Sequence, residues 1–375
     1  MRTRMRLLLG TAAFLGIAAF LGGAGTGRSE MGLISNLWSN TMPIGLAGAR
    51  ADDTALSPSL TALLSAKEWL NTSAPKPADL RGKVVLVNFW TYSCINCLRA
   101  LPYVKGWAEK YHDQGLVVIG VHTPEFAFEK ISDKVQRALH MLDVPYPVAL
   151  DNDFALWNAF GNRAWPALYF INAQGEVAHS QLGEGDYAES EELIQQLLKE
   201  AGSGAAPKPI APIAGEGAQA APDLAALGSG ETYIGYGQAS GFASPQSFAG
   251  DRTRSYTLPD NPWLNEWGLG GDWIVGREFA TSAAPKSSIA YRFHARDLHL
   301  VMAPTSLDQP IRFRVTLDGK APGADHGADT DADGWGVLKE DRLYQLVRQS
   351  AEVQDRTFRI EFDAPGAKTY AFTFG

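Results

Sequence analysis

The chain has 375 residues, of which 45% are hydrophobic and 20% are charged, and its formal net charge is −8. This acidic balance, without a long run of like charges, gives no indication of nucleic-acid binding, because the phosphate backbone requires a basic face. The length permits two domains that each bury a hydrophobic core.

The first 28 residues have the pattern of an export signal or a membrane anchor. Three arginines precede an uncharged apolar stretch over residues 7–27, as in the basic and apolar regions of a signal peptide. The stretch approaches the length of a membrane span, so an uncleaved anchor stays open. We expect residues 29–54 to form a linker and the protein to work in the periplasm or another extracytoplasmic space, either secreted or anchored.

Residues 55–201 alternate between the patterns of buried strands and of helices. Strands are expected at residues 84–90, 116–121, 167–171 and 177–180, and helices at residues 98–111, 126–142 and 189–201. Such alternation predicts an α/β fold that contains parallel strand pairs.

Residues 202–225 are rich in Pro, Gly and Ala and poor in large apolar side chains, which is typical of a linker. From residue 226 to residue 375 the hydrophobic period changes to two, and five alternating runs are joined by Gly, Pro and Asp turns. This pattern favours an antiparallel β-sandwich of jelly-roll type. One or two helical turns are expected around residues 342–350.

Cys94 and Cys97 are the only cysteines, and they directly follow the apolar strand 84–90. A thiolate at the start of a helix is stabilised by unpaired backbone N–H groups and by the helix dipole. Cys94 is placed to attack a substrate disulfide, and Cys97, one turn later, to resolve the mixed disulfide. The pair therefore predicts a redox-active Cys94–Cys97 disulfide with no other cofactor; an inert structural pair is the alternative.

The stretch NFWTYSCINC, followed by Pro102, resembles the thioredoxin superfamily, and more narrowly its extracytoplasmic thiol-disulfide oxidoreductases of the TlpA and ResA type. The phrases VIGVHTPEFAFEK, YPVALDN, FGNRAWPALYFIN and LGEGDY are similar to the soluble portion of DipZ proteins, over about residues 60–375. The resemblance implies a thioredoxin-like domain that reduces protein disulfides in the cell envelope. DipZ proteins carry a polytopic membrane domain where this chain has one apolar segment, so a separate membrane electron donor is implied.

The resemblance also implies roles for three residues outside the cysteine pair. Trp165 and Pro166 would bind the substrate, since Pro166 falls where the superfamily has a cis-proline that faces the dithiol and pairs with the substrate backbone nearby. Glu125 falls where related reductases place an acidic side chain, which would take a proton from Cys97 during resolution. The alternatives are an ordinary proline at the start of a strand and a first-turn glutamate stabilised by the helix dipole.

One acidic loop has the spacing of a calcium-binding loop. The residues concerned are Asp329, Asp331, Asp333 and Glu340. Flanking helices are missing from the pattern, and Gly336 replaces the usual apolar residue. A solvated acidic loop is therefore the favoured interpretation, with no metal assigned.

The tryptophans of the second domain allow two interpretations. Exposed aromatic rings stack on sugars, and the DipZ resemblance implies a carbohydrate-binding-like module. Strand-like spacing at Trp267 and Trp273 instead favours burial in the core, which we expect for most of Trp263, Trp267, Trp273 and Trp335.

Two other functions stay open beside disulfide exchange. The first is a cell-envelope binding protein whose sandwich recognises a glycan or a protein partner, with the thioredoxin-like domain as a scaffold. The second is a thiol-dependent peroxidase, because Thr91 and Cys94 match part of the peroxiredoxin pattern. Val87 stands where that pattern requires proline, which ranks peroxidase activity below disulfide exchange.

Overall fold

The computed structural model describes residues 56–204 and 215–375. The expected export signal and first linker, residues 1–54, lie outside the described residues, as does the middle of the second linker. Within the two described ranges, no helix has the length and apolar character needed to cross a membrane.

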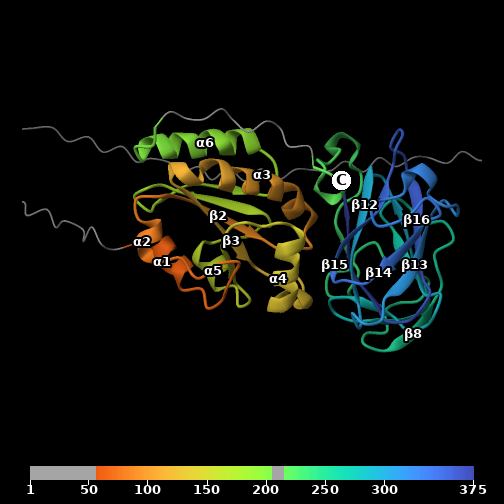
Figure 1. Ribbon diagram of the computed structural model, residues 1–375. Coiled ribbons are helices and arrows are strands. Elements are labelled where there is room, and N and C mark those ends of the chain that lie inside the picture. The colour runs from red at the N-terminus through yellow and green to blue at the C-terminus, as the bar shows by residue number, and fades with distance from the viewer. Residues whose placement is uncertain (1–55, 205–214) are drawn as a thin grey trace, which may run out of the picture. The chain divides into compact units, whose positions relative to one another are not determined.

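The first domain is a six-stranded mixed sheet with helices on both faces (Figure 1). In the order β1-β4-β3-β2-β5-β6, strands β2, β3 and β4 are parallel, and β1, β5 and β6 pair antiparallel with their neighbours. The strands are β1 (Trp69–Leu70), β2 (Val84–Trp90), β3 (Leu116–His122), β4 (Val148–Leu150), β5 (Ala167–Ile171) and β6 (Val177–Leu182). The helices are α1 (Pro58–Leu64), α2 (Pro77–Leu80), α3 (Ile95–Tyr111), α4 (Ser132–Met141), α5 (Ala155–Ala159) and α6 (Tyr187–Glu200).

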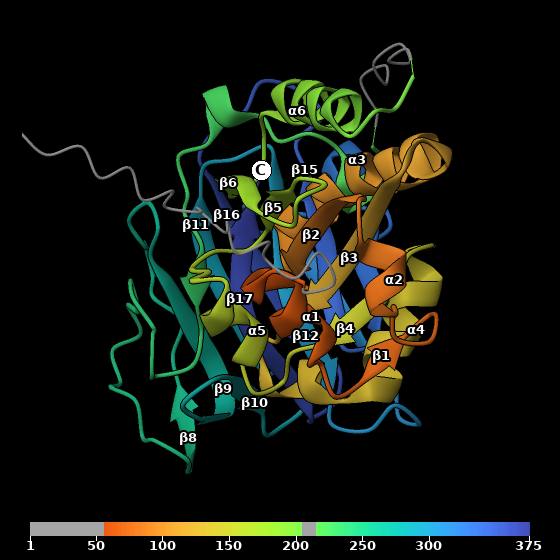
Figure 2. The ribbon, with the colours of Figure 1, turned by 90° about the vertical axis from the view of Figure 1, so that its left-hand side faces the viewer.

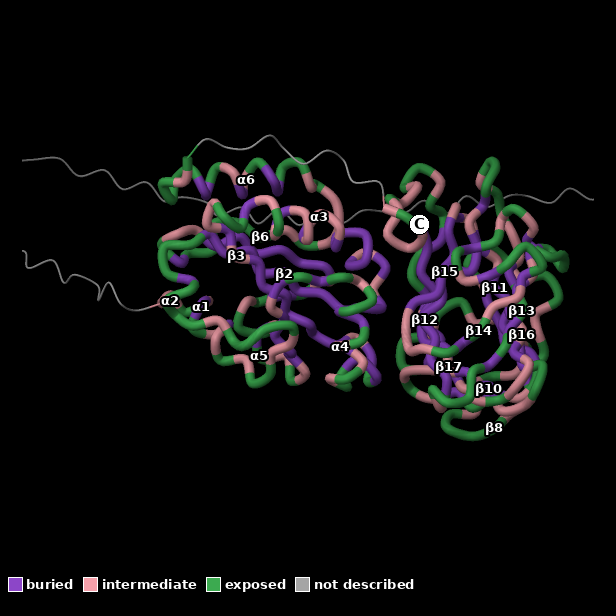
Figure 3. The backbone as a smooth tube through the Cα atoms, viewed as in Figure 1, coloured by how far each residue is buried: buried purple, intermediate pink, exposed green. Residues whose placement is uncertain are grey.

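The two faces of this sheet bury separate hydrophobic cores. Successive side chains of β2 point to opposite faces, so Leu86 packs with α3 and α6, and Val87 with α1 and α5. Helices α3 and α6 run side by side above the strands (Figure 2). Because both faces are covered, every residue of β2 is buried (Figure 3). The α/β fold expected from the sequence is confirmed.

The single helix expected over residues 126–142 is wrong. The chain forms a short 3₁₀ helix, η2 (Ala127–Lys130), and then α4, with an extended residue, Ile131, between them. Phe126, Phe128 and Glu129 are all buried. A regular helix would place Phe126 and Glu129 on one face and Phe128 on another, whereas the broken backbone buries all three side chains.

The second domain is an antiparallel sheet of eleven strands that curls into a sandwich. Strand β9 belongs to both layers: residues 267–270 pair with β11, and residues 271–275 pair with β8 and β10. The change of partner falls at Gly271, whose φ of 80° is readily adopted only by glycine. The strands are β7 (Thr232–Tyr233), β8 (Thr253–Tyr256), β9 (Trp267–Val275), β10 (Ala280–Ser282), β11 (Ser288–Phe293), β12 (Asp297–Pro304), β13 (Ile311–Leu317), β14 (Trp335–Leu338), β15 (Arg342–Arg348), β16 (Arg356–Phe362) and β17 (Ala367–Phe374).

The helical turns expected around residues 342–350 are also wrong, because this segment is strand β15. Tyr344 and Leu346 pack inside the sandwich, whereas Leu343 packs with the core of the first domain. Because both faces of β15 are covered, its apolar residues do not alternate, and Leu343, Leu346 and Val347 have the spacing of one face of a helix.

The two domains pack together through the outer face of β12, β15 and β17. Val301, Leu343 and Tyr370 belong to the same buried cluster as the α3 side of the first domain. Arg99 of α3, which is 4% exposed, donates to the carbonyl of Phe374 at 3.1 Å. Both domains therefore belong to one compact unit in the described part of the chain.

Candidate active site

Cys94 and Cys97 lie at the N-terminus of α3, directly after the loop that follows β2. Cys94 is the N-cap residue, and its Sγ accepts a hydrogen bond from the backbone N–H of Cys97 at 3.4 Å. Both cysteines are free thiols. Cys94 is partly exposed, whereas Cys97 is only 2% exposed. An incoming disulfide can therefore reach Cys94, and Cys97 is shielded behind it.

The buried position of Cys97 raises the pKa of its thiol. Desolvation is the largest cause, followed by the hydrogen bond and the charge of Cys94, and the negative charge of Glu125 acts in the same direction. A thiol must lose its proton before it attacks a disulfide. Cys97 therefore needs a proton acceptor at the moment of resolution.

Glu125 lies between β3 and η2, is half-buried, and interacts electrostatically with Cys97. Its carboxylate accepts a hydrogen bond from the hydroxyl of Tyr233, on β7 of the second domain, at 2.5 Å. Burial raises the pKa of Glu125 to about 8, the carboxylates of Glu231 and Glu129 add to the rise, and the Tyr233 hydrogen bond opposes it. Glu125 can thus bind or release a proton near neutral pH.

Glu129 was not identified from the sequence, although it is fully buried beside the cysteine pair. Its carboxylate accepts from Ser93 Oγ at 2.6 Å and from the backbone N–H groups of Glu125 and Phe126 at 2.7 and 2.9 Å. Burial raises the pKa of Glu129, and the hydrogen bonds oppose that rise. The available signal was an acidic residue directly after the apolar run Phe126–Phe128.

Trp165 and Pro166 precede β5 and are joined by a cis peptide bond. The Trp165 ring packs against the buried cluster that contains Cys97, and its Nε1 donates to the carbonyl of Thr123 at 3.1 Å. Pro166 is buried, and its carbonyl accepts from the backbone N–H of Gly183 at 2.8 Å. The structure thus packs Trp165 against the same extended hydrophobic core as Cys97, and the substrate-binding role of Trp165 and Pro166 stays a prediction.

The acidic loop with calcium-like spacing is organised by an arginine. Arg342 donates to both oxygens of Asp329, at 2.7 and 3.1 Å, and to Glu340 at 3.1 Å. Asp331 instead accepts from the backbone N–H groups of Asp333 and Trp335. No group of three or more acidic, histidine or cysteine side chains in the described residues could hold a metal ion. In the described residues the carboxylates of Asp329 and Glu340 are thus paired with Arg342, whereas Asp331 caps the backbone of its own loop.

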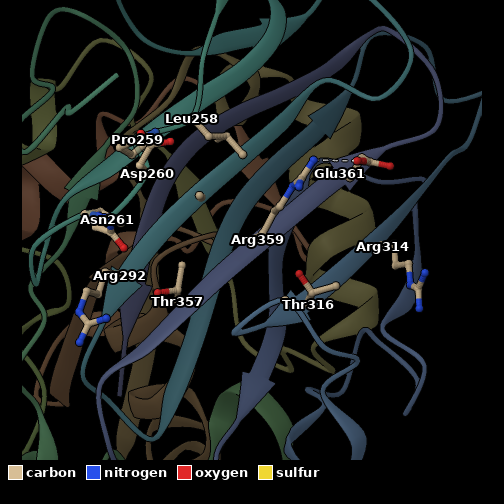
Figure 4. A pocket seen from close by; sticks show the side chains of 13 residues that line it. Leu258, Pro259, Asp260, Asn261, Arg292, Arg314, Thr316, Thr357, Arg359 and Glu361 are labelled. Carbon is tan, nitrogen blue, oxygen red and sulfur yellow. Dashed lines mark hydrogen bonds and ion pairs between the residues drawn. The ribbon is translucent and has the colours of Figure 1, made fainter. Parts of the chain in front are cut away.

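The second domain has a polar cavity of about 380 Å³ on the outer face of β11, β13 and β16 (Figure 4). Arg292, Arg314 and Arg359 line it, together with threonine, asparagine and carboxylate side chains. Arg359 is paired with Glu361 at 2.9 Å.

The tryptophans of the second domain divide between core and surface. Trp267 and Trp273 are fully buried, which confirms the core expectation for both. Trp263 is 79% exposed and follows Pro262, which lines the polar cavity. Trp335 is partly exposed, and the guanidinium groups of Arg312 and Arg314 lie over its ring.

An accessible sulfur with a shielded partner one helical turn away can capture a substrate disulfide as a mixed disulfide and then release the substrate as a dithiol, which is the chemistry of thioredoxin-like oxidoreductases. The comparisons agree: residues 58–197 match the Redoxin family, and residues 229–375 match the family described as thioredoxin-like C-terminal domain. The chain belongs to the thioredoxin-like thiol-disulfide oxidoreductases.

Three relatives illustrate this membership. Protein DipZ of Mycobacterium tuberculosis (strain CDC 1551 / Oshkosh) is 40% identical over 315 residues, which are 82% of this chain and 41% of that protein. Thiol-disulfide oxidoreductase YkuV of Bacillus subtilis (strain 168) is 32% identical over 37% of this chain and 93% of its own. Thiol-disulfide oxidoreductase ResA of Halalkalibacterium halodurans is 28% identical over 33% of this chain and 67% of its own. The chain thus spans less than half the length of DipZ.

Proposed function

We propose that the protein reduces disulfides of other proteins in an extracytoplasmic compartment, with Cys94 as nucleophile and Cys97 as resolving thiol. The observation that carries the proposal is the contrast in exposure between the two sulfurs. The Cys94 thiolate attacks a substrate disulfide, forms a mixed disulfide and releases the first substrate thiol. Cys97 then attacks Cys94 and displaces the second substrate thiol. The substrate has gained two electrons, and Cys94 and Cys97, which supplied them, are joined as a disulfide.

Glu125 accepts the proton of Cys97 in the resolution step. A carboxylate with a pKa of about 8 is a stronger base than an ordinary glutamate and still exists partly ionised near neutral pH. The interaction between Glu125 and Cys97 supports this role. Trp165 and Pro166 would position the substrate chain beside Cys94.

The extracytoplasmic location rests on the N-terminal pattern of three arginines followed by an apolar run. Reducing equivalents then come from a separate membrane donor, as the DipZ resemblance implies. Cell fractionation, with mass determination of the mature N-terminus, tests the location. Recovery of the unprocessed protein in the cytosolic fraction would overturn it.

The redox function is tested by reduction of insulin with dithiothreitol as the electron source. We expect activity in the native protein, none in Cys94→Ser, and a stalled mixed disulfide on Cys94 in Cys97→Ser. Equilibration with glutathione redox buffers gives the direction of exchange. Full activity in Cys94→Ser would contradict the proposal, and a potential like that of strong oxidants would contradict the reductive direction.

A second function, glycan binding by the second domain, is favoured by the polar cavity and the exposed ring of Trp263 next to it. Arginine, threonine and asparagine side chains can hydrogen-bond sugar hydroxyl or carboxylate groups, and an exposed indole can stack on a sugar ring. Titration with acidic and neutral oligosaccharides should show binding that Trp263→Ala weakens and that Cys94→Ser leaves unchanged. Equal binding by native protein and Trp263→Ala would remove this role of Trp263.

A further inference from the structure

We propose that Tyr233 of the second domain is a positioning residue of the redox site, which holds the Glu125 carboxylate as the proton acceptor for Cys97. The second domain is then a working part of the disulfide exchanger. This inference rests on the disulfide-reducing function proposed above, and the experiment below separates the failure of one from the failure of the other.

The contact itself joins residues 108 positions apart in the chain. The Tyr233 hydroxyl donates to Glu125 Oε1 at 2.5 Å, and the same hydroxyl lies 3.2 Å from an oxygen of Glu231. A phenol has one proton to donate, and the shorter distance assigns it to Glu125. Burial and the neighbouring carboxylates raise the pKa of Tyr233, so the hydroxyl keeps its proton.

The second domain fixes the place of this hydroxyl. Tyr233 is on β7, where it pairs with Ala371 of β17 in the antiparallel register. The ring also packs near Phe126, with ring centroids 6.3 Å apart. Both the backbone and the ring of Tyr233 are therefore held, so the hydroxyl presents a fixed donor to Glu125.

The surroundings of Glu125 are otherwise acidic. Glu129 from η2 and Glu231 and Glu278 from the second domain face it, and each carboxylate favours the neutral form of Glu125. Glu125 and Tyr233 line a cavity of about 450 Å³, and Arg277 and Glu278 line it as well. Besides these groups, Glu125 interacts with Cys97. The Tyr233 hydroxyl favours the ionised form of Glu125, which is the form able to accept a proton.

The segment after Glu125 is held independently of this hydroxyl. The Glu278 carboxylate accepts from the backbone N–H of Ala127 at 2.7 Å, and Phe128 packs on Tyr370 with ring centroids 4.8 Å apart. Glu129 also accepts a hydrogen bond from the backbone N–H of Glu125, at 2.7 Å. Removing the hydroxyl alone therefore leaves the loop in place, which makes Tyr233→Phe a specific probe.

In the resolution step the proton of the Cys97 thiol moves to a Glu125 oxygen. The Cys97 sulfur forms a bond with Cys94 Sγ, and the bond between Cys94 and the substrate sulfur breaks. The substrate leaves as a thiolate, and Glu125 returns its proton to solvent through the adjoining cavity. Without the Tyr233 hydroxyl, less of Glu125 is ionised at a given pH, so this step slows.

Ellman's reagent separates the two thiol steps. Attack by Cys94 releases one thionitrobenzoate, and resolution by Cys97 releases the second, so the rate of the second release reports proton transfer from Cys97. In Tyr233→Phe we expect the pH midpoint of this second rate to rise by about 1 pH unit and the rate near neutral pH to fall about tenfold. The first release should keep its native rate.

Tyr236→Phe is the matched control, because the Tyr236 hydroxyl donates to Asp251 and makes no contact with Glu125 among the described hydrogen bonds. It should behave as the native protein. In a Glu125→Gln background, Tyr233→Phe should add no further slowing, as expected for two residues that act as a unit. A native pH profile in Tyr233→Phe would overturn the inference while leaving the dithiol function intact. A second release that persists in Cys97→Ser would instead overturn the proposed function.

Discussion

Ser93 donates a hydrogen bond of 2.6 Å to Glu129, and this bond connects the residue before Cys94 to the segment that carries Glu125. The same carboxylate binds two backbone N–H groups of that segment. The nucleophile and the proposed proton acceptor are thus held by one buried side chain.

Replacing Glu129 by alanine should therefore damage both stability and exchange. The Ser93 hydroxyl and two buried N–H groups lose their acceptor, which should lower the free energy of unfolding by about 3 kcal/mol. Glu129→Gln is the matched control, since its amide can still accept from the N–H groups. Urea denaturation measures the stability, and native stability in Glu129→Ala would contradict the bridging role.

The exposure of the two sulfurs predicts their order of labelling. In the reduced native protein, iodoacetamide should modify Cys94 at least about tenfold faster than Cys97, whose thiol is buried and whose pKa is raised. Mass spectrometry of peptides after timed quenching measures both rates. In denaturant the two rates should converge, and equal rates in the folded protein would contradict the shielding of Cys97.

The pKa of Glu125 predicts a loss of stability as pH rises. Its folded-state value of about 8 lies above the ordinary value of 4.5, so between these values the native protein binds more protons than the unfolded chain. The stability that comes from this proton is fully present below about pH 4.5 and lost as the pH approaches about 8.

Glu125→Gln should remove this pH dependence and leave the variant more stable than the native protein near pH 8, by about 1 kcal/mol once the partial exposure of Glu125 is considered. Urea midpoints near pH 5 and pH 8 measure it. Glu189→Gln, at an exposed position, serves as the control and should keep the native slope. An unchanged slope in Glu125→Gln would mean that this carboxyl titrates in the ordinary range.

Arg99 predicts coupling between the two domains. Its guanidinium is buried, pairs with Glu184 at 2.9 Å and donates to the carbonyl of Phe374 in the second domain. Arg99→Met should lower the free energy of unfolding by about 2 kcal/mol, because a partly buried carboxylate and a buried carbonyl lose their partner.

Lys67→Met is the control, because it removes a solvent-exposed ion pair of similar length, between Lys67 and Asp153. This variant should keep the native stability. Thermal unfolding followed by circular dichroism compares the two variants. Equal changes in the unfolding temperature of the two variants would show that the burial of Arg99 does not make its ion pair more stabilising.

The parts of the site that are local in sequence could be predicted. Cys94 follows an apolar strand and begins a helix, and both patterns are visible within about ten residues. Pro166 and Glu125 were placed only through resemblance to a family, because nothing in the chemistry of a proline or a glutamate alone indicates a redox site.

The parts that depend on tertiary contacts could not be predicted. The Tyr233 hydroxyl reaches Glu125 from another domain, and no local pattern connects the two residues. Glu129 looked like an ordinary charged residue, since its partners are one hydroxyl and two backbone N–H groups that only the fold assembles. Strand β15 was mistaken for helix because Leu343 is covered by a domain that periodicity cannot detect.

The apolar outer face of β12, β15 and β17 has a consequence for the two halves of the chain as separate molecules. Val301, Leu343 and Tyr370 would all meet water if the second half stood alone, and such a patch attracts any complementary surface. Halves produced as two polypeptides should therefore reassemble into a working heterodimer, detectable by co-elution in gel filtration. If the two polypeptides stay monomeric and do not aggregate when they are mixed, the contact between the domains depends on the linker that joins them.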